Sequence, residues 1–174
     1  MEKNKFIYPL VFSLFFFCFQ LLPAQLVEVY KVEDYLENLS KSKDKNQAEL
    51  KSLLYDSQNS LFVNSQEGAS SYFKDKSDIV LINISSPSDL KAIVDKYNTH
   101  LSTVKMFMID WDGRYSFSIP SDLTSQFSDL KYVVVRSYGA IDETKVRNSF
   151  SALIDTYNTV PKLLVILYSK LKQQ

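Results

Sequence analysis

Two carboxylates that lie close together, Asp110 and Asp112, are the residues whose types and spacing could most readily do chemistry. They belong to Asp110-Trp-Asp-Gly113, which directly follows the apolar run 104–109. Aspartate and glycine also end strands for a conformational reason, because both tolerate the backbone angles of a tight turn. The stretch lacks the run of spaced oxygen ligands that a calcium loop carries. We therefore interpret it first as a turn at the end of a strand.

An apolar strand followed by Asp-x-Asp-Gly resembles the first motif of haloacid-dehalogenase-type phosphatases. The resemblance implies that one carboxylate acts as nucleophile and the other as acid and base, with a magnesium ion shared with the substrate phosphate. Ser137 would then be the phosphate-binding hydroxyl. Arg114 stands where the family has threonine, and no acidic cluster follows Lys162. A small phosphatase that uses Asp110 and Asp112 is therefore the alternative function, and a non-catalytic chain is preferred.

Other sets of catalytic or cofactor-binding residues are missing from the sequence. His100 is the only histidine, and no partner at an informative spacing completes a catalytic triad around it. The three glycines do not form a phosphate-binding loop. Acidic and basic residues balance to a net charge of +0, which argues against nucleic acid as a partner. The sequence thus predicts no cofactor and no metal.

The remaining candidate site is a contact surface on two neighbouring strands. Three runs dominated by apolar residues begin at 78, 104 and 130, a constant step of 26 residues. If these runs are adjacent strands, the step places residue 106 beside 132 and residue 110 beside 136. Tyrosine and arginine are favoured anchors at protein interfaces. The predicted partner-binding residues are Met106, Met108, Asp110, Tyr132, Val134 and Arg136.

Stepping from these residues to the elements that hold them, the chain is predicted to be an α/β protein. A fourth run, 161–167, follows the other three after a longer step, and helical or turn-rich stretches separate all four. Ser86-Pro87 is predicted to begin one helix and Asp142 to cap another. Strands separated by connections of this length are parallel neighbours joined by right-handed crossovers.

Two architectures satisfy this pattern. The stretch 119–135, with its Ile119-Pro120 opening and spaced apolar positions, resembles a leucine-rich repeat, and a step of 26 lies within that family's range. The resemblance covers about 80–168 and implies a short right-handed solenoid with all connections on one face. The alternative is an open, doubly wound parallel sheet with helices on both faces. Strands that are apolar on both sides, as here, are typical of sheets covered twice.

The remainder of the chain is predicted to support this region. Residues 26–76 read as a helical cap that forms one domain with the β/α region 77–174, because a terminal repeat has one side without a neighbour. Residues 1–25 resemble a secretory signal peptide: two lysines near the start, an apolar core, and Pro23 near the end. The tail Ala24-Gln25 resembles signal peptides of the Bacteroidetes group of bacteria.

These features together predict the function only as a class. Cleavage after Gln25 would remove Cys18, the only cysteine, and leave no membrane span. We expect an exported protein, secreted or periplasmic, that is not an enzyme. It is predicted to be a non-catalytic leucine-rich-repeat-like module that binds another protein or a surface polymer.

Overall fold

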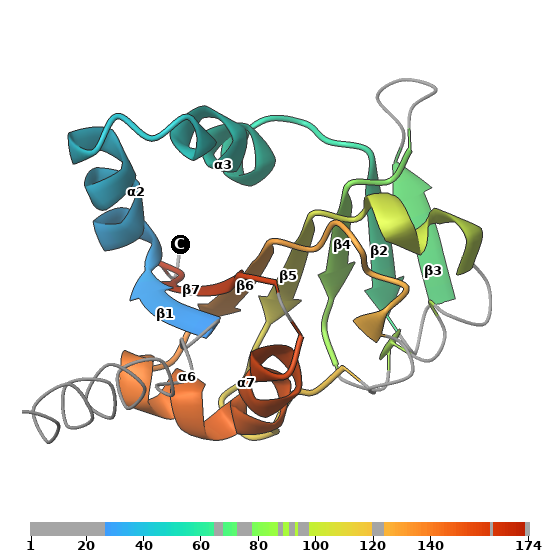
Figure 1. The fold of residues 1–174 in the computed structure, drawn as a ribbon. Helices are drawn as coiled ribbons and strands as arrows, with labels where there is room; N and C mark the ends of the chain where they lie inside the picture. Colours follow the sequence, from blue (N-terminus) through green and yellow to red (C-terminus); the bar gives the residue numbers. More distant parts are fainter. Residues whose placement is uncertain are drawn as a thin grey trace, which may run out of the picture.

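The chain folds around one seven-stranded sheet. The structure is a computed structural model that describes residues 27–64, 68–72, 78–86, 89–90, 93, 98–119, 124–160 and 162–172. The strand order is β1-β7-β6-β5-β4-β2-β3 (Figure 1). Neighbours are parallel except in the antiparallel β2–β3 hairpin. The strands are β1 (Val27–Lys31), β2 (Ser60–Asn64), β3 (Gly68–Tyr72), β4 (Leu81–Ile84), β5 (Met106–Asp110), β6 (Tyr132–Ser137) and β7 (Leu164–Lys170). The predicted α/β class is confirmed.

The constant step of 26 residues corresponds to the register of three adjacent strands. Met106 lies beside Leu81 on one side and beside Tyr132 on the other. Asp110 lies beside Arg136, as predicted. Because side chains alternate between the two faces of a strand, an equal step keeps laterally paired residues on the same face. The predicted lateral pairs are therefore confirmed.

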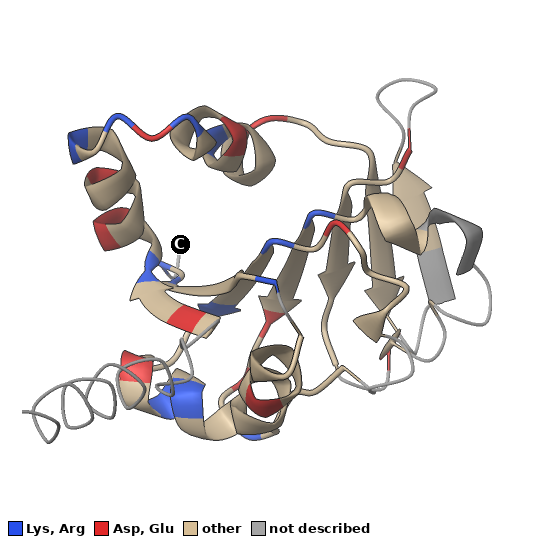
Figure 2. Ribbon diagram, viewed as in Figure 1, with Lys and Arg blue, Asp and Glu red and all other residues tan. Residues whose placement is uncertain are grey.

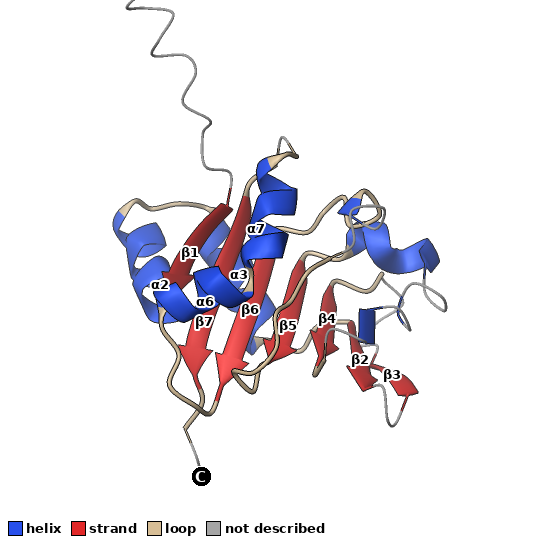
Figure 3. Cartoon of the chain, turned by 90° about the horizontal axis from the view of Figure 1, so that it is seen from below, coloured by secondary structure: helices blue, strands red, loops and turns tan. Residues whose placement is uncertain are grey.

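The connections after β4, β5 and β6 all pack on one face of the sheet. The last of them contains α6 (Glu143–Ser149) and α7 (Ser151–Asn158), which cover β6 and β7 in Figure 3. Asp142 caps α6 as predicted, because its Oδ1 accepts the Lys145 backbone N–H at 2.8 Å. After β4, residues 89–90 and 93 are helical and a 3₁₀ helix, η2 (Asn98–Thr103), follows. Pro87 and most of that predicted helix lie outside the described residues.

Aromatic side chains form the centre of the core on this face. Phe107 of β5 lies edge-on to Phe127, with ring centroids 4.9 Å apart. Phe150, at the junction of α6 and α7, packs against both Trp111 and Phe117. All five side chains are buried. The connections are thus fixed to the sheet by large apolar groups rather than by polar contacts.

The opposite face of the sheet is covered by α2 (Val32–Lys41) and α3 (Asn46–Tyr55), which form an arch above it in Figure 1. Leu39 of α2 and Leu50 of α3 are buried in one cluster with Met106 and Tyr132. A one-sided solenoid would leave these strand residues open to a partner. Here helices lie on both faces, which accounts for strands that are apolar on both sides.

The region 26–76 differs from the predicted helical cap, because it adds three strands to its two helices. β1 pairs with β7 at one edge of the sheet, and β2 and β3 extend the sheet beyond β4. Buried Val27 and Val29 alternate with less buried neighbours, which is the period of a strand. Five residues are too few for that alternation to stand out in the sequence.

No helix within the described ranges is long and apolar enough to cross a membrane. The predicted signal peptide, residues 1–25, lies outside the described part of the chain.

Glu49 joins α3 to the starting ends of two strands. Its carboxylate accepts hydrogen bonds from the ammonium groups of Lys105, at 2.9 Å, and Lys131, at 2.8 Å. Partial burial would raise the pKa of Glu49, but the hydrogen bonds from Lys131 and Lys105 outweigh it and lower that pKa below its usual 4.5. Figure 2 shows basic segments where β5 and β6 begin, below the acidic part of α3.

Glu49→Gln is expected to destabilise the protein by about 1 kcal/mol at neutral pH, because it removes both ion pairs. The folded-state pKa is lowered, so this stability is present above the unfolded-state value of 4.5 and is lost as the pH falls through the folded-state value. Urea unfolding across an acid pH series measures it. The variant should lose less stability than wild type on acidification, whereas Glu143→Gln, in an exposed pair with Arg147, should behave as wild type. Parallel acid limbs for wild type and Glu49→Gln would contradict this.

Candidate binding cleft

The predicted contact surface lies mostly inside the protein. Met106, Tyr132 and Val134 are no more than 3 % exposed and Met108 is 8 % exposed, because α2 and α3 cover their face of the sheet. Burial raises the pKa of the Tyr132 hydroxyl to about 12. These four residues therefore stabilise the core in this structure and are not free to meet a partner.

The other two predicted residues, Asp110 and Arg136, form an exposed ion pair at the carboxyl ends of β5 and β6. The Arg136 Nη2 lies 2.7 Å from Asp110 Oδ1, and the Nε donates to the same oxygen at 2.8 Å. Their side chains are 29 % and 51 % exposed, for arginine and aspartate respectively. The strand register brings them together as predicted, although the apolar platform beside them is covered.

The Asp110–Gly113 stretch has the geometry of a turn. The Asp112 Oδ1 accepts the Arg114 backbone N–H at 2.9 Å, which is an Asx turn. Gly113 has a φ of 84°, in the left-handed region that glycine adopts without strain. Both carboxylates thus have structural partners, Arg136 and the turn backbone. In the described ranges no group of three or more His, Cys, Asp or Glu side chains could hold a metal ion.

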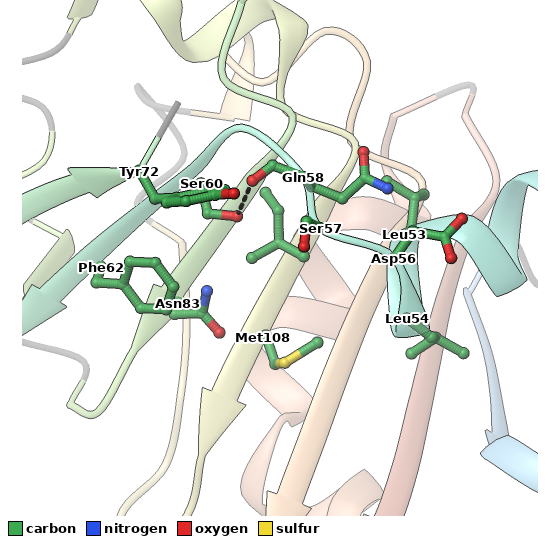
Figure 4. A pocket seen from close by; sticks show the side chains of 11 residues that line it. Leu53, Leu54, Asp56, Ser57, Gln58, Ser60, Phe62, Tyr72, Asn83 and Met108 are labelled. Atoms are coloured by element: carbon green, nitrogen blue, oxygen red, sulfur yellow. Dashed lines mark hydrogen bonds between the residues drawn. The ribbon is translucent and has the colours of Figure 1, made fainter. Parts of the chain in front are cut away.

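A cleft on the α2–α3 face is the feature best suited to bind a ligand. It has a volume of about 360 Å³, which lies within the usual range for ligand sites. It opens where α3 ends and the chain turns toward β2, over strands that no described helix covers. The residues that line it are Leu53, Leu54, Asp56, Ser57, Gln58, Ser60, Phe62, Tyr72, Leu81, Asn83 and Met108 (Figure 4).

Three strands supply the floor of this cleft. Asn83 of β4 lies between Phe62 of β2 and Met108 of β5 in the strand register. Because all three occupy laterally equivalent positions, they lie in one row, which Figure 4 shows. Phe62 is 46 % exposed, whereas Met108, nearer α3, is 8 % exposed. The row thus runs from the covered core to the open edge of the sheet.

Asn83 is the polar group at the centre of this row. The rest of β4 is Leu81, Ile82 and Ile84, all buried. No described residue forms a hydrogen bond with the Asn83 side-chain amide, although an amide offers two donors and one acceptor. Its carboxamide therefore faces the cleft with its hydrogen-bonding groups available to a ligand.

The polar rim of the cleft is held by local hydrogen bonds. The Gln58 side-chain amide donates to the Ser52 carbonyl at 2.8 Å, which ties the turn to α3. The Ser60 hydroxyl donates to the Gln58 carbonyl at 3.0 Å. These bonds fix the turn that separates α3 from β2, so that the opening is largely formed before any ligand arrives.

The edge strand β3 borders the open end of the cleft. Ser70, Ser71 and Tyr72 are exposed, and Tyr72 lies beside Ser60 across the hairpin. Within the described part of the chain β3 pairs only with β2. Its sequence, Gly-Ala-Ser-Ser-Tyr, contains none of the charges or prolines that usually block an edge. The edge can therefore accept hydrogen bonds from, and donate them to, another strand.

Sequence reasoning missed this cleft. One signal was present: Asn83 is the only polar residue in an otherwise aliphatic strand. Its meaning depends on where α3 ends above the sheet, which no local pattern encodes. Phe62 and Tyr72 were hidden in a region predicted to be helical or turn-like.

No protein-family model, curated protein or solved structure matches this chain. Its function is therefore inferred from the fold and from the geometry of the cleft.

Proposed function

We propose that this chain is an exported, non-catalytic module that binds an extended segment of a partner protein at the cleft and along β3. The observation that carries the proposal is the uncovered row of Phe62, Asn83 and Met108 beside an edge strand with no described partner on its outer side. An accessible apolar site and an open sheet edge lie next to each other, and an extended peptide is the ligand that uses both.

Strand addition supplies the first part of the binding energy. A peptide that pairs with β3 completes main-chain hydrogen bonds that the edge otherwise makes only with water. Such bonds do not depend on the peptide's sequence, so the cleft must select among peptides. The Tyr72 ring, 49 % exposed at one end of β3, is placed to contact a side chain of the added strand.

The cleft supplies the selection. Leu54, Phe62 and Met108 form an apolar lining that suits one large aliphatic or aromatic side chain. The Asn83 carboxamide can bond a peptide group or a polar atom of that side chain, and would disfavour a ligand that leaves it unpaired. A single deep anchor beside main-chain pairing is a common form of peptide recognition.

Within this proposal, 77–174 is a leucine-rich-repeat-like β/α region, supported by its one-sided connections after β4, β5 and β6. In that family the open sheet face binds the partner. Here α2 and α3 occupy most of that face, so binding is displaced to the part that they leave uncovered. Export rests on the signal-like residues 1–25.

Selection of a phage-displayed library of random peptides on the immobilised protein tests the proposal. We expect enriched peptides with one large apolar residue in an otherwise extended sequence. Phe62→Asp and Asn83→Leu should each weaken their binding by at least about tenfold. Methylation of backbone nitrogens on one side of the peptide should weaken it comparably, because strand pairing needs those N–H groups.

Tyr138→Ala is the matched control, since Tyr138 is also an exposed aromatic residue, at 61 %, and does not line the cleft. It should leave peptide affinity unchanged. Failure to enrich any peptide, or equal losses in Tyr138→Ala and Phe62→Asp, would overturn the proposed function. Circular dichroism of each variant establishes that the fold is retained.

A further inference from the structure

A second cavity lies at the carboxyl ends of the strands, away from the cleft. Its volume is about 620 Å³. Lys31 ends β1, Lys170 ends β7, and Tyr138 directly follows β6, so three adjacent parallel strands deliver residues to it. Leu171 and Lys172 of the segment after β7 complete the wall with Glu33 of α2. The Leu171 backbone N–H donates to the Ser137 carbonyl at 2.8 Å, which fixes that segment against β6.

The topology of the sheet singles out the same place. The connection after β1 enters α2, which packs on one face, whereas the connection after β6 enters α6 and α7, which pack on the other. β7 lies between these two strands. Where neighbouring connections leave toward opposite faces, a crevice opens at the carboxyl edge, and open α/β sheets bind ligands in it. The cavity occupies that crevice.

The charge of the cavity defines its ligand. Three of its six lining residues are lysines and one is acidic. Glu33 lies 3.5 Å from Lys31 in a pair that is largely exposed and therefore weak. Neither Lys170 nor Lys172 forms an ion pair with a described carboxylate. Figure 2 shows basic residues where β1 meets α2, beside the C-terminal end of the chain.

We propose that this cavity binds a multiply charged oxyanion, such as a phosphate or polycarboxylate group, between the ammonium groups of Lys31, Lys170 and Lys172. Lysine acts as a mobile point charge and binds phosphate without a fixed geometry. The exposed Tyr138 ring gives the cavity one flat aromatic wall, against which the uncharged part of such a ligand can pack. This site is independent of the cleft and of the proposed peptide binding.

Titration calorimetry of the full chain at low ionic strength, with sodium pyrophosphate and trisodium citrate as probes and sodium chloride at matched ionic strength, tests the proposal. Binding of one equivalent is expected, with a dissociation constant below about 10 mM, and it should weaken strongly in high salt. Tighter binding of pyrophosphate would assign the site to phosphates, and tighter binding of citrate to carboxylates.

The double variant Lys170→Ala/Lys172→Ala should weaken probe binding by at least about tenfold. Lys45→Ala/Lys51→Ala is the matched control, because it removes the same charge from exposed positions near α3 and should bind as wild type. Equal losses in the two double variants would reduce the effect to overall charge and overturn the site. Absence of heat for both probes with the wild-type chain would overturn it as well.

Discussion

Replacement of Phe107 by alanine is expected to remove about 3–5 kcal/mol from the free energy of unfolding, the largest loss for any single change considered. Phe107 is fully buried in β5, between Ile82 and Val133 in the strand register, and lies edge-on to Phe127. Alanine would leave a cavity at the centre of the sheet that rigid strands cannot close. Because domains are stable by only about 5–15 kcal/mol, a large part of the population would unfold under mild denaturant. Urea unfolding followed by circular dichroism measures the loss.

Tyr138→Ala serves as the control for this change also. It removes a ring of similar size from an exposed position and should alter stability by less than about 0.5 kcal/mol. If the two variants unfolded at the same urea concentration, Phe107 would not lie in the core and the strand register would be wrong.

Leu50→Ala is the second change with a large expected effect, and it acts on α3. Leu50 is fully buried against the face of the sheet that α2 and α3 cover. Its truncation is expected to cost about 2–5 kcal/mol. Because the ion pairs of Glu49 alone are too weak to hold α3, the helix should open more often than the sheet unfolds. Hydrogen exchange should therefore accelerate most in Asn46–Tyr55.

Leu54→Ala is the matched control on the same helix. Leu54 is half-buried and lines the cleft, so its loss should cost clearly less stability while changing the shape of the cleft wall. Equal destabilisation by the two substitutions would contradict the orientation of α3, since it would mean that both side chains are equally buried.

The sequence was informative where an element repeats or carries its own signal. The step of 26 residues predicted the lateral pairs of β4, β5 and β6, because parallel strands joined by similar connections keep the same register. Asp142 predicted the start of α6 through a local hydrogen bond that needs no tertiary context. The strands begin and end within about three residues of the predicted runs, as is usual for pattern-based boundaries.

The N-terminal third could not be predicted in the same way. β1 and β2 are five residues each and become strands by pairing with β7 and β4, far along the chain. Their alternation of buried and exposed positions is too short to outweigh the helical pattern around them. Which face α2 and α3 would cover was equally hidden, because their apolar stripes suit either side of an apolar sheet.

This hidden choice decided the fate of the candidate contact surface. Met106 and Tyr132 were correctly paired, but pairing does not reveal whether a helix lies above them. The packing of Leu50 and Leu53 buries them, and the end of α3 at Tyr55 leaves Asn83 and Phe62 accessible instead. The binding surface is therefore determined by the length of one helix relative to the sheet.

The most direct test of the proposed function is amide chemical-shift mapping with a peptide obtained by the selection described above. Binding is predicted to shift the amides of β3, of Phe62 and Asn83, and of the turn 56–59, and to leave those of α6 and α7 in place. Shifts centred on α6, α7 or the carboxyl edge of β7, with β3 and Asn83 unchanged, would contradict the assignment of the cleft as the partner-binding site.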